Sequence, residues 1–406
     1  MKFREIFNAA VVVAALGYFV DVYDLVLFLI VGKTSLLDIG VPQEKVIESF
    51  QFLLNVQMAG MLVGGIVFGV LGDKKGRLSV LFGSIITYSL ANIANGFVTN
   101  IEMYTVLMFI AGFGLAGELR AGITLVSEIM DKEKRGYGTM LVASIGVTGA
   151  VVAGLVGQVG WQIAYFIGGG LGLSLLLLRI GVFESGMFHK VKGHSVQRGN
   201  FFMLFNNRKR AFKYINCILI GLPVWFIIGI LVGLSPVFAK ELGIDGVVED
   251  ANSVMLCYGG LVFGDLFSGA LSNLMRSRKK VFLIFYGLCI VFVTTYLKLN
   301  NSSLVVFNTI IFLLGFSVGF WAIFVTVASE QFGTNVRATV TTTVPNFVRG
   351  SLVLIVMLNK FMINTLGLGL LVGTGLTAVI VFAISFLSLF NLQDTFGKDL
   401  DYHELS

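Results

Sequence analysis

Residues 17–32 read GYFVDVYDLVLFLIVG, and this stretch decides the fold class because it places Asp21 and Asp24 inside an apolar run. The run is about 25 residues long, enough to cross the hydrocarbon core of a bilayer as one helix. An ionised side chain at membrane depth costs roughly 2.5–3.5 kcal/mol, so it must face a cavity, a partner or a proton path. The stretch therefore predicts a membrane-spanning helix with a function, and not a cleaved signal segment.

The rest of the chain has the composition of a polytopic membrane protein. Its 406 residues are 56% hydrophobic and only 13% charged, whereas a soluble domain carries about 25% charged residues. Because the bilayer offers no water to backbone groups, each span must satisfy its own hydrogen bonds as a helix. The apolar segments predict twelve helices, at about residues 7–32, 50–72, 78–98, 101–129, 137–159, 161–182, 212–239, 251–274, 280–298, 303–330, 337–359 and 365–391.

The distribution of Lys and Arg predicts the orientation of these helices. With both termini in the cytoplasm, most basic residues lie in the inner connections, and the outer connections hold only Lys33, Lys45, Lys240, Lys298 and Lys360. The positive-inside rule favours this orientation. The net charge of +6 then reflects membrane topology, so we expect a lipid bilayer around the chain and no nucleic-acid partner.

The cysteines and histidines do not form the pattern of a metal or redox site. Cys217, Cys257 and Cys289 all fall within predicted spans, without the spacing of a disulfide framework or of metal ligands. The three histidines fall in inner loops or in the tail, so histidine is not available as a proton relay within the membrane. We expect no metal and no cofactor.

A polar, basic segment between the sixth and seventh predicted helices divides the chain into two halves. We expect four parts: an N-terminal six-helix bundle at 1–183, a cytoplasmic basic linker at 184–211, a C-terminal six-helix bundle at 212–391 and a cytoplasmic tail at 392–406.

The two halves repeat each other in sequence. The stretch Gly69–Asp73 is matched 200 residues later by Gly269–Asn273, and Ser127-Glu128 is matched 202 residues later by Ser329-Glu330. Such an internal parallel repeat is typical of transporters, which place their binding site between the halves near the membrane midplane. Alternating access by rocking of the two halves is the mechanism that this organisation predicts.

The loop after the second predicted helix carries a specific motif. The run Gly69-Val-Leu-Gly-Asp73-Lys74-Lys75-Gly76-Arg77 resembles the loop signature of the major facilitator superfamily, Gly-x-x-x-Asp-(Arg/Lys)-x-Gly-(Arg/Lys). The resemblance implies an all-α membrane protein with twelve transmembrane helices in two pseudo-symmetric six-helix bundles. It also implies a latch for one gating state, formed by Gly69, Asp73, Lys74, Gly76 and Arg77. The second half has lost the acid of this motif, which predicts a weaker latch there.

Further segments resemble the metabolite:proton symporter branch of that superfamily. They are Gly17-Tyr-Phe-Val-Asp21-Val-Tyr23-Asp24, Gly114-Leu-Ala-Gly117-Glu118, the stretch from Arg179 to Phe188, and Glu330-Gln-Phe-Gly-Thr334-Asn-Val-Arg337. We add Glu128, Arg135, Glu330 and Arg337 to the predicted gating residues. Arg120 departs from the pattern of the branch, and Gly149-Ala150 replaces the Gly-Pro of drug antiporters, which counts against efflux by antiport.

The acids of the first helix are the predicted proton carriers. Tyr18, Asp21 and Asp24 follow a spacing of three and therefore share one face of the helix. Two carboxylates this close repel each other, which favours protonation of one of them. We predict that Asp21 or Asp24 carries the coupled proton, with Glu118 as a further proton-coupling residue. The alternative is a structural carboxylate, paired permanently with Arg120 or with a tyrosine hydroxyl.

Arginine and aromatic residues are the candidates for contact with the transported solute. Arg120 either faces the acids of the first helix or binds a substrate carboxylate. Arg349 lies at the same depth as Asp265, so it either forms a structural ion pair with Asp265 or meets an anionic group. The predicted substrate-binding residues are Tyr18, Tyr23, Arg120, Trp225, Trp321, Asn346 and Arg349. For Trp225, Trp321 and Asn346, ordinary packing is the alternative.

These features predict a secondary active transporter that takes up a small polar metabolite, such as an organic acid, an amino acid or a betaine, by proton-coupled symport. The alternative is a proton-coupled exporter of a cationic or amphiphilic compound, because four acids and only two arginines lie deep in apolar stretches. An enzyme is not expected, since the sequence has no Gly-rich phosphate loop and no nucleophile–base pair. We expect a monomer in the inner membrane of a bacterial cell, with a small-molecule substrate and protons as its partners.

Overall fold

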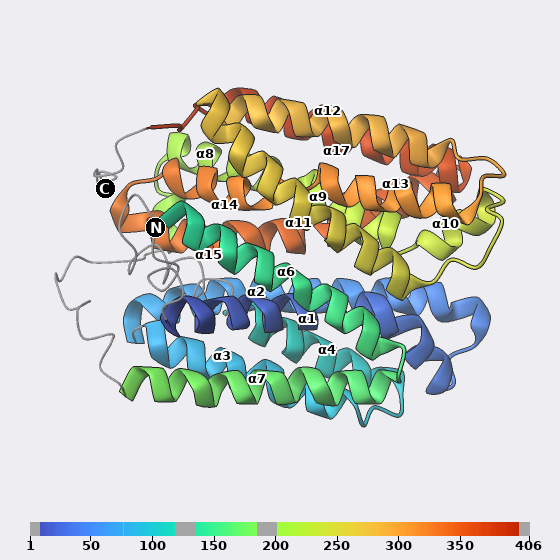
Figure 1. Ribbon diagram of the computed structural model, residues 1–406, viewed down its shortest axis with the longest axis horizontal. Helices are drawn as coiled ribbons and strands as arrows, with labels where there is room; N and C mark the ends of the chain where they lie inside the picture. The colour runs from blue at the N-terminus through green and yellow to red at the C-terminus, as the bar shows by residue number, and fades with distance from the viewer. Residues whose placement is uncertain (1–8, 76, 118–134, 185–200, 398–406) are drawn as a thin grey trace. The chain divides into compact units, whose positions relative to one another are not determined.

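The computed structural model describes residues 9–75, 77–117, 135–184 and 201–397. The chain divides into two compact units, Met1–Phe201 and Phe202–Ser406, and their helices are shown in Figure 1. Within the described ranges every named element is helical, and nine helices are long and apolar enough to cross a membrane. The prediction of an all-α membrane protein is therefore confirmed.

The N-terminal unit is built from long helices. Its described elements are α1 (Ala9–Asp38), η2 (Gln43–Lys45), α2 (Val46–Lys75), α3 (Arg77–Asn95), α4 (Ile101–Leu115), α6 (Arg135–Gly157) and α7 (Trp161–Glu184). The helix α1 packs along α6 and α7, while α4 packs on both α2 and α3. The start of α4 is fixed by Asn100, whose side chain accepts the backbone N–H of Met103 at 2.8 Å.

The C-terminal unit contains more and shorter helical pieces. After η4 (Phe201–Leu204), they are α8 (Arg208–Leu219), α9 (Leu222–Phe226), η5 (Ile227–Val232), α10 (Ser235–Glu241), α11 (Asp250–Met275), α12 (Arg278–Leu297), α13 (Leu304–Ser317), α14 (Trp321–Glu330), α15 (Thr334–Gly350), α16 (Leu352–Lys360), η6 (Phe361–Thr365) and α17 (Gly369–Asn391). The strongest pairing in this unit is between α11 and α13.

Prolines account for the interruptions between α8 and α10. Pro223 and Pro236 occupy the first turns of α9 and α10, where a missing N–H costs least. Between these prolines, η5 is a π-helix, a wider turn that is frequent at functional sites. The predicted helix at 212–239 is thus helical as expected, but it is divided into pieces with different hydrogen-bond patterns.

The predicted helix at 303–330 is also interrupted, between Ser317 and Trp321. At the interruption, a Cβ added to Gly319 would meet the backbone of Gly264 and Asp265 on α11. This close approach lets the Asp265 carboxylate accept the backbone N–H of Ala322 at 3.1 Å. The interruption therefore places the start of α14 against α11, with an acidic side chain that satisfies its first turn.

The same glycine contacts hold one helix pair together in each unit. Two glycines, four residues apart, let the backbone of one helix touch the backbone of the next. The contacts are Gly60–Phe109 and Gly64–Phe113 between α2 and α4, and Gly260–Phe312 and Gly264–Phe316 between α11 and α13. The glycines recur after 200 residues and the phenylalanines after 203. The sequence repeat thus extends to the way in which the backbones pack.

Candidate functional site

Asp21 and Asp24 are buried on α1, with exposed fractions of 0% and 4%. The helix α6 packs against this part of α1 through two glycines: a Cβ at Gly146 would meet the ring of Tyr18, and a Cβ at Gly149 would meet the backbone of α1. Both carboxylates therefore lie in the protein interior, as expected for functional acids at membrane depth.

The carboxylate of Asp24 lies against Gly168 of α7. A Cβ added to Gly168 would fall on Asp24 Oδ1 and close to the ring of Tyr23. The Tyr23 hydroxyl donates to the carbonyl of Ala164, one turn earlier on α7, at 2.9 Å. Tyr23 thus fixes α1 on α7, and Gly168 leaves the space that the acid occupies.

A row of buried hydroxyls joins α1, α4 and α7 nearer the end of α1. Ser35 Oγ lies 2.9 Å from the hydroxyl of Tyr104, which lies 2.7 Å from the hydroxyl of Tyr165. Ser35 also donates to the carbonyl of Gly32 at 2.9 Å. Tyr165 is one turn from Gly168 on α7. These hydrogen bonds therefore fix the position of α7, the helix that contacts Asp24.

In the C-terminal unit, Arg349 and Asp265 approach the same turn of α14. Arg349 is only 2% exposed, and its Cζ lies 5.9 Å from the ring centre of Trp321, which is a cation–π contact. Asp265 accepts the backbone N–H of Ala322, the next residue after Trp321. A direct ion pair between Asp265 and Arg349 stays a prediction.

Trp225 lies one turn after Gly221 on α9. At Gly221, α9 meets α14 and α15, because a Cβ there would contact Phe324 and Val348. Trp225 is 2% exposed, and its indole N–H has no hydrogen-bond partner among the residues that the structure describes. A buried donor without a partner costs free energy, which a bound acceptor recovers. Asn346 is also buried, and its amide donates to the backbone of its own helix at 3.1 Å.

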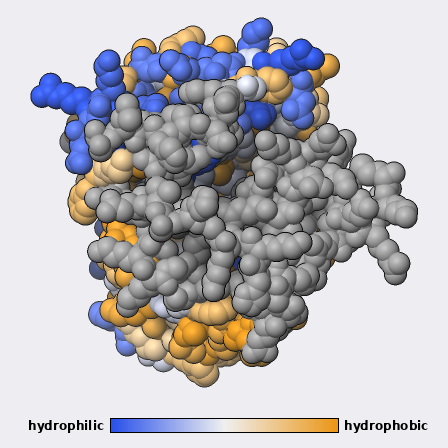
Figure 2. Space-filling view, turned by 90° about the vertical axis from the view of Figure 1, so that its left-hand side faces the viewer, coloured by the Kyte–Doolittle hydropathy of each residue, from blue (hydrophilic) through white to orange (hydrophobic). Residues whose placement is uncertain are grey.

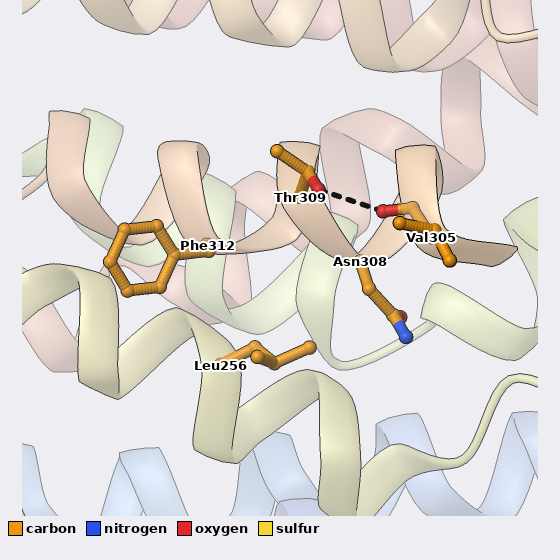
Figure 3. A pocket seen from close by; sticks show the side chains of 5 residues that line it. All are labelled: Leu256, Val305, Asn308, Thr309 and Phe312. Atoms are coloured by element: carbon orange, nitrogen blue, oxygen red, sulfur yellow. Dashed lines mark hydrogen bonds between the residues drawn. The ribbon is translucent and has the colours of Figure 1, made fainter.

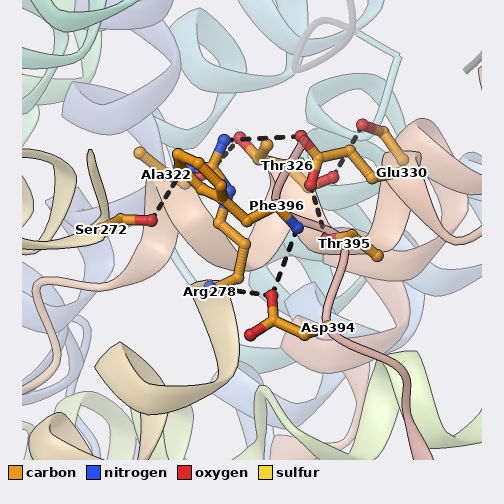
Figure 4. Close-up of polar contacts among 9 residues, drawn as sticks. Ser272, Arg278, Ala322, Thr326, Glu330, Asp394, Thr395 and Phe396 are labelled. Atoms are coloured by element: carbon orange, nitrogen blue, oxygen red, sulfur yellow. Dashed lines mark hydrogen bonds and ion pairs between the residues drawn. The ribbon is translucent and has the colours of Figure 1, made fainter. Parts of the chain in front are cut away.

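Glu330, a predicted gating residue, belongs to a polar cluster at the end of α14 (Figure 4). Glu330 Oε1 lies 3.5 Å from Arg278 Nη2, and Glu330 Oε2 accepts the Thr395 hydroxyl at 2.6 Å. Arg278 also donates to Ser272 at 2.8 Å, and its Cζ lies 5.2 Å from the ring centre of Phe396. The cluster joins the end of α14, the start of α12 and the segment after α17.

Asp394 satisfies the start of α12. Its carboxylate accepts the hydroxyl of Ser277 and, at 3.0 Å, the backbone N–H of Arg278. Burial raises the pKa of Asp394, but these hydrogen bonds lower it by more, so the pKa lies below its ordinary value. A negative charge at the start of a helix is also favourable because of the helix dipole.

Hydrophilic residues gather on this end of the C-terminal unit, in the upper part of Figure 2. Exposed basic residues lie at the start of α8, at the end of α11 and at the start of α12: Arg208, Lys209, Arg276 and Lys280. Such a basic surface at helix ends is the pattern that the positive-inside rule describes for cytoplasmic loops.

Two further predicted gating residues are described. Gly69 is buried in α2. Arg337 lies in the first turn of α15, and its Nε donates at 3.1 Å to the carbonyls of both Ser329 and Phe332. Other candidates lie outside the described residues, namely Gly76, Glu118, Arg120 and Glu128; the side chains of Asp73, Lys74, Arg77 and Arg135 lie outside them as well.

A shallow recess between α11 and α13 contains none of the predicted site residues (Figure 3). It is lined by Leu256, Val305, Asn308, Thr309 and Phe312. The Thr309 hydroxyl donates to the carbonyl of Val305 at 2.8 Å, which leaves the amide of Asn308 as the polar group of the recess. We assign no function to it.

Three residues of the site could not be identified from the sequence: Gly168, Arg278 and Thr395. Gly168 belongs to the run Gly168-Gly169-Gly170, a signal of close approach that does not say which group approaches. In the sequence, Arg278 is one of several basic residues of an inner loop, and nothing there indicates that it pairs with Glu330. Thr395 fell in the segment assigned to the tail, where no helical pattern indicates a partner.

Ionisable side chains that are kept in the interior of membrane helices, such as Asp21, Asp24 and Arg349, are typical of membrane transporters. The comparison with known families gives the particular family. The model of the Major Facilitator Superfamily matches residues 14–356, and the chain belongs to this superfamily. The resemblance inferred from the loop motif is therefore confirmed.

Relatives of the chain carry the names of metabolite transporters. A probable 4-methylmuconolactone transporter of Cupriavidus pinatubonensis is 26% identical over 80% of this chain and 76% of its own length. The sialic acid transporter NanX of Escherichia coli is 26% identical over 72% of each chain. The niacin transporter NiaP of Acinetobacter baylyi is 32% identical over 39% of this chain and 36% of its own length. The chain is accordingly a transporter of small metabolites and not an enzyme.

Proposed function

We propose that the chain takes up a small organic acid, or a similar polar metabolite, together with protons. The observation that carries this proposal is the pair of buried carboxylates, Asp21 and Asp24, one turn apart on α1. Two charges this close and this far from water favour a state in which one carboxylate holds a proton. Glu118 is proposed as a further proton-coupling residue from its place in the sequence.

The contact between Asp24 and α7 suggests how a proton changes the transporter. An ionised Asp24 needs water or a polar partner, whereas a neutral one tolerates an apolar environment. Because Asp24 lies directly on Gly168, a change in its charge acts on the packing of α1 against α7. In alternating access, the proton and the solute bind on one side, and the loaded transporter then opens to the other side.

For the solute we propose a subsite around Arg349 and Trp321. The planar guanidinium of arginine binds carboxylates through two parallel hydrogen bonds, and the Trp321 ring offers a flat apolar face. Trp225 adds a buried N–H donor. Relatives are named for niacin and for sialic acid, both of which carry a carboxylate. Tyr18, Tyr23, Arg120 and Asn346 complete the proposed substrate-binding residues.

We further propose twelve transmembrane helices in two six-helix bundles, at 1–183 and 212–391, with a linker at 184–211 and a tail at 392–406. The glycine contacts that recur in α2–α4 and α11–α13 support this pseudo-symmetry. The excess of basic residues in the inner loops supports cytoplasmic termini in a bacterial inner membrane. We propose a monomer as the transporting form.

The polar cluster around Glu330 and Arg278 is proposed as the cytoplasmic latch of the C-terminal bundle. Its ion pair and its hydrogen bond from Thr395 tie the ends of α12 and α14 to the segment after α17, and Arg337 ties α14 to α15. Rocking of the bundle then requires these contacts to open. In the N-terminal bundle the corresponding residues are proposed to be Gly69, Asp73, Lys74, Gly76, Arg77, Glu128 and Arg135.

Uptake in right-side-out vesicles tests the proton coupling. Radiolabelled niacin and sialic acid are the first probes, followed by the carboxylate that most raises the thermal stability of the purified protein. We expect an inward proton gradient to drive accumulation, and we expect Asp21→Asn or Asp24→Asn to abolish it. Unchanged acid-stimulated accumulation in both variants would refute the assignment. Faster proton-driven movement in everted vesicles would instead favour an exporter.

A further inference from the structure

Asp265 is an acidic residue at membrane depth for which the function proposed above has no use. It lies well inside α11, which runs from Asp250 to Met275, and is about 15 Å from the end of that helix. Such a residue is a functional candidate by default, because keeping it within the membrane is costly.

The carboxylate of Asp265 contacts the first turn of α14. Gly319, just before α14, lies against the backbone of Gly264, and this approach brings Asp265 Oδ1 to 3.1 Å from the N–H of Ala322. A negative charge at this position is attracted by the unpaired N–H groups and the dipole of the helix. That attraction exists only while the carboxylate is ionised.

The helix α14 connects Asp265 to two other charged groups. Its first residue, Trp321, lies under the guanidinium of Arg349, with 5.9 Å between Cζ and the ring centre. Its last residue, Glu330, pairs with Arg278. The helix spans about 14 Å between these ends. A displacement of its first turn therefore acts on the Arg349 contact and on the end cluster together.

Charged side chains on the elements packed against α11 are confined to the ends of those elements. Neither α13 nor η5 carries a charged residue. Those of the other neighbours are Lys240 and Glu241 at the end of α10, Arg278, Lys279 and Lys280 at the start of α12, and Glu330 at the end of α14. The other titratable groups of α11 and α12 are Asp250, Cys257, Tyr258, Tyr286, Cys289 and Tyr296. Beyond these, Arg349 reaches the first turn of α14 through Trp321.

We propose that Asp265 binds and releases a proton during transport, and that its charge sets the position of α14. The proton adds to a carboxylate oxygen, and no covalent bond of the protein breaks. The neutral acid no longer attracts the helix dipole, so α14 moves relative to α11 and Trp321 moves relative to Arg349. This role rests on the proposed proton-coupled transport for its place in the cycle, but the protonation itself requires no solute.

Fluorescence of Trp321 tests the proposal in the full chain, reconstituted in lipid nanodiscs. Trp161 and Trp225 are replaced by Phe, which leaves Trp321 as the only tryptophan. We expect the Trp321 emission to titrate between acid and mildly alkaline pH. Asp265→Asn should lose this titration and show at every pH the emission that the parent shows at acid pH. Asp265→Glu should restore a titration. The matched control is Asp250→Asn on the same helix, which should titrate like the parent.

Three results would overturn the proposal: no titration of Trp321 in the parent, an unchanged titration in Asp265→Asn, or an alkaline-form emission in that variant. If the two Phe replacements prevent folding, solute exchange is measured against pH in the otherwise unaltered chain. The proposal predicts that Asp265→Asn gives a flat pH profile, and a profile like that of the parent would overturn it. Asp21→Asn and Asp24→Asn keep the two proposals apart. If both retain acid-stimulated uptake while Asp265→Asn loses the titration, the proposed role of α1 fails and that of Asp265 stands.

Discussion

At the scale of single residues, the absence of a side chain at Gly168 shapes the surroundings of Asp24. The Asp24 carboxylate lies too close to Gly168 to leave room for a Cβ there, and Tyr23 holds α1 at this position through its hydrogen bond to Ala164. A larger residue at 168 must move either the acid or the helix. Because interiors are closely packed, such a shift is not absorbed by empty space.

Gly168→Ala should therefore lower acid-stimulated uptake about tenfold or more, since small misplacements of a reacting group have effects of this size. The matched control is Gly170→Ala on the same helix, where a Cβ would meet no atom within 4 Å. Initial rates of uptake in vesicles measure the difference. Equal rates for the two variants would show that the space at Gly168 does not matter for coupling.

Asp394 gives a prediction for stability against pH. In the folded protein, its hydrogen bonds hold the pKa of the Asp394 carboxyl below the ordinary value. Its contribution to the free energy of unfolding is therefore complete above about pH 4 and is lost as the pH falls through the lowered pKa. Asp394→Ala should cost about 1 kcal/mol at neutral pH, the usual value of a helix cap, and less in strong acid, where the carboxylate is protonated. Thermal unfolding of both proteins across pH measures this difference.

The control for that experiment is Gln393→Ala. Its backbone carbonyl accepts the Gln331 amide at 2.7 Å, and that contact does not depend on the side chain of residue 393. A loss of stability in Gln393→Ala equal to that in Asp394→Ala would show that the segment acts through its general packing and not through the carboxylate.

At the scale of elements, the pairing of α11 with α13 depends on glycine. A Cβ at Gly260 would meet the backbone of Phe312, so Gly260→Ala forces the two helices apart. Overpacking of this kind costs about 1–3 kcal/mol, and we expect a lower unfolding temperature in detergent. In Gly259→Ala, the added Cβ would make only an ordinary contact, 3.9 Å from the ring of Phe312. Equal melting of the two variants would contradict the role of Gly260.

The sequence predicts the existence and position of most of these helices, because apolar runs of sufficient length have few other structures in a bilayer. It does not predict where the helices are interrupted. Pro223 and Pro236 signal a break but not the π-helix between them. The gap before Trp321 has no proline, and it arises from the approach of Gly319 to α11, a tertiary contact that periodicity does not reveal.

The candidate site could be predicted only in part for the same reason. The cost of burying a charge makes Asp21, Asp24 and Arg349 conspicuous in the sequence, and all three are buried. Their neighbours could not be derived, because Gly168 and Thr395 make their contacts through the fold. From the sequence, Arg349 either pairs with Asp265 or meets an anionic group, and neither reading predicts that the Asp265 carboxylate accepts the backbone N–H of Ala322.

At the scale of the whole molecule, the proposed mechanism needs a charge that changes as the transporter reorients. The buried acids of α1 are proposed to supply such a charge in the N-terminal unit, and Asp265 is proposed to do so in the C-terminal unit. Because of the glycine contacts shared by α2–α4 and α11–α13, we expect each of these helix pairs to move as one element. Proton movement and solute movement should then be linked in every cycle.

Proton movement itself is the most direct measurement of this link. The purified chain is placed in liposomes that contain a pH-sensitive dye, and niacin, or the carboxylate selected by thermal stability, is added outside without a pH gradient. Proton-coupled symport predicts that solute entry acidifies the lumen faster than in protein-free liposomes, and that Asp24→Asn removes this difference. Solute entry through the protein with no proton movement beyond that of protein-free liposomes would contradict it.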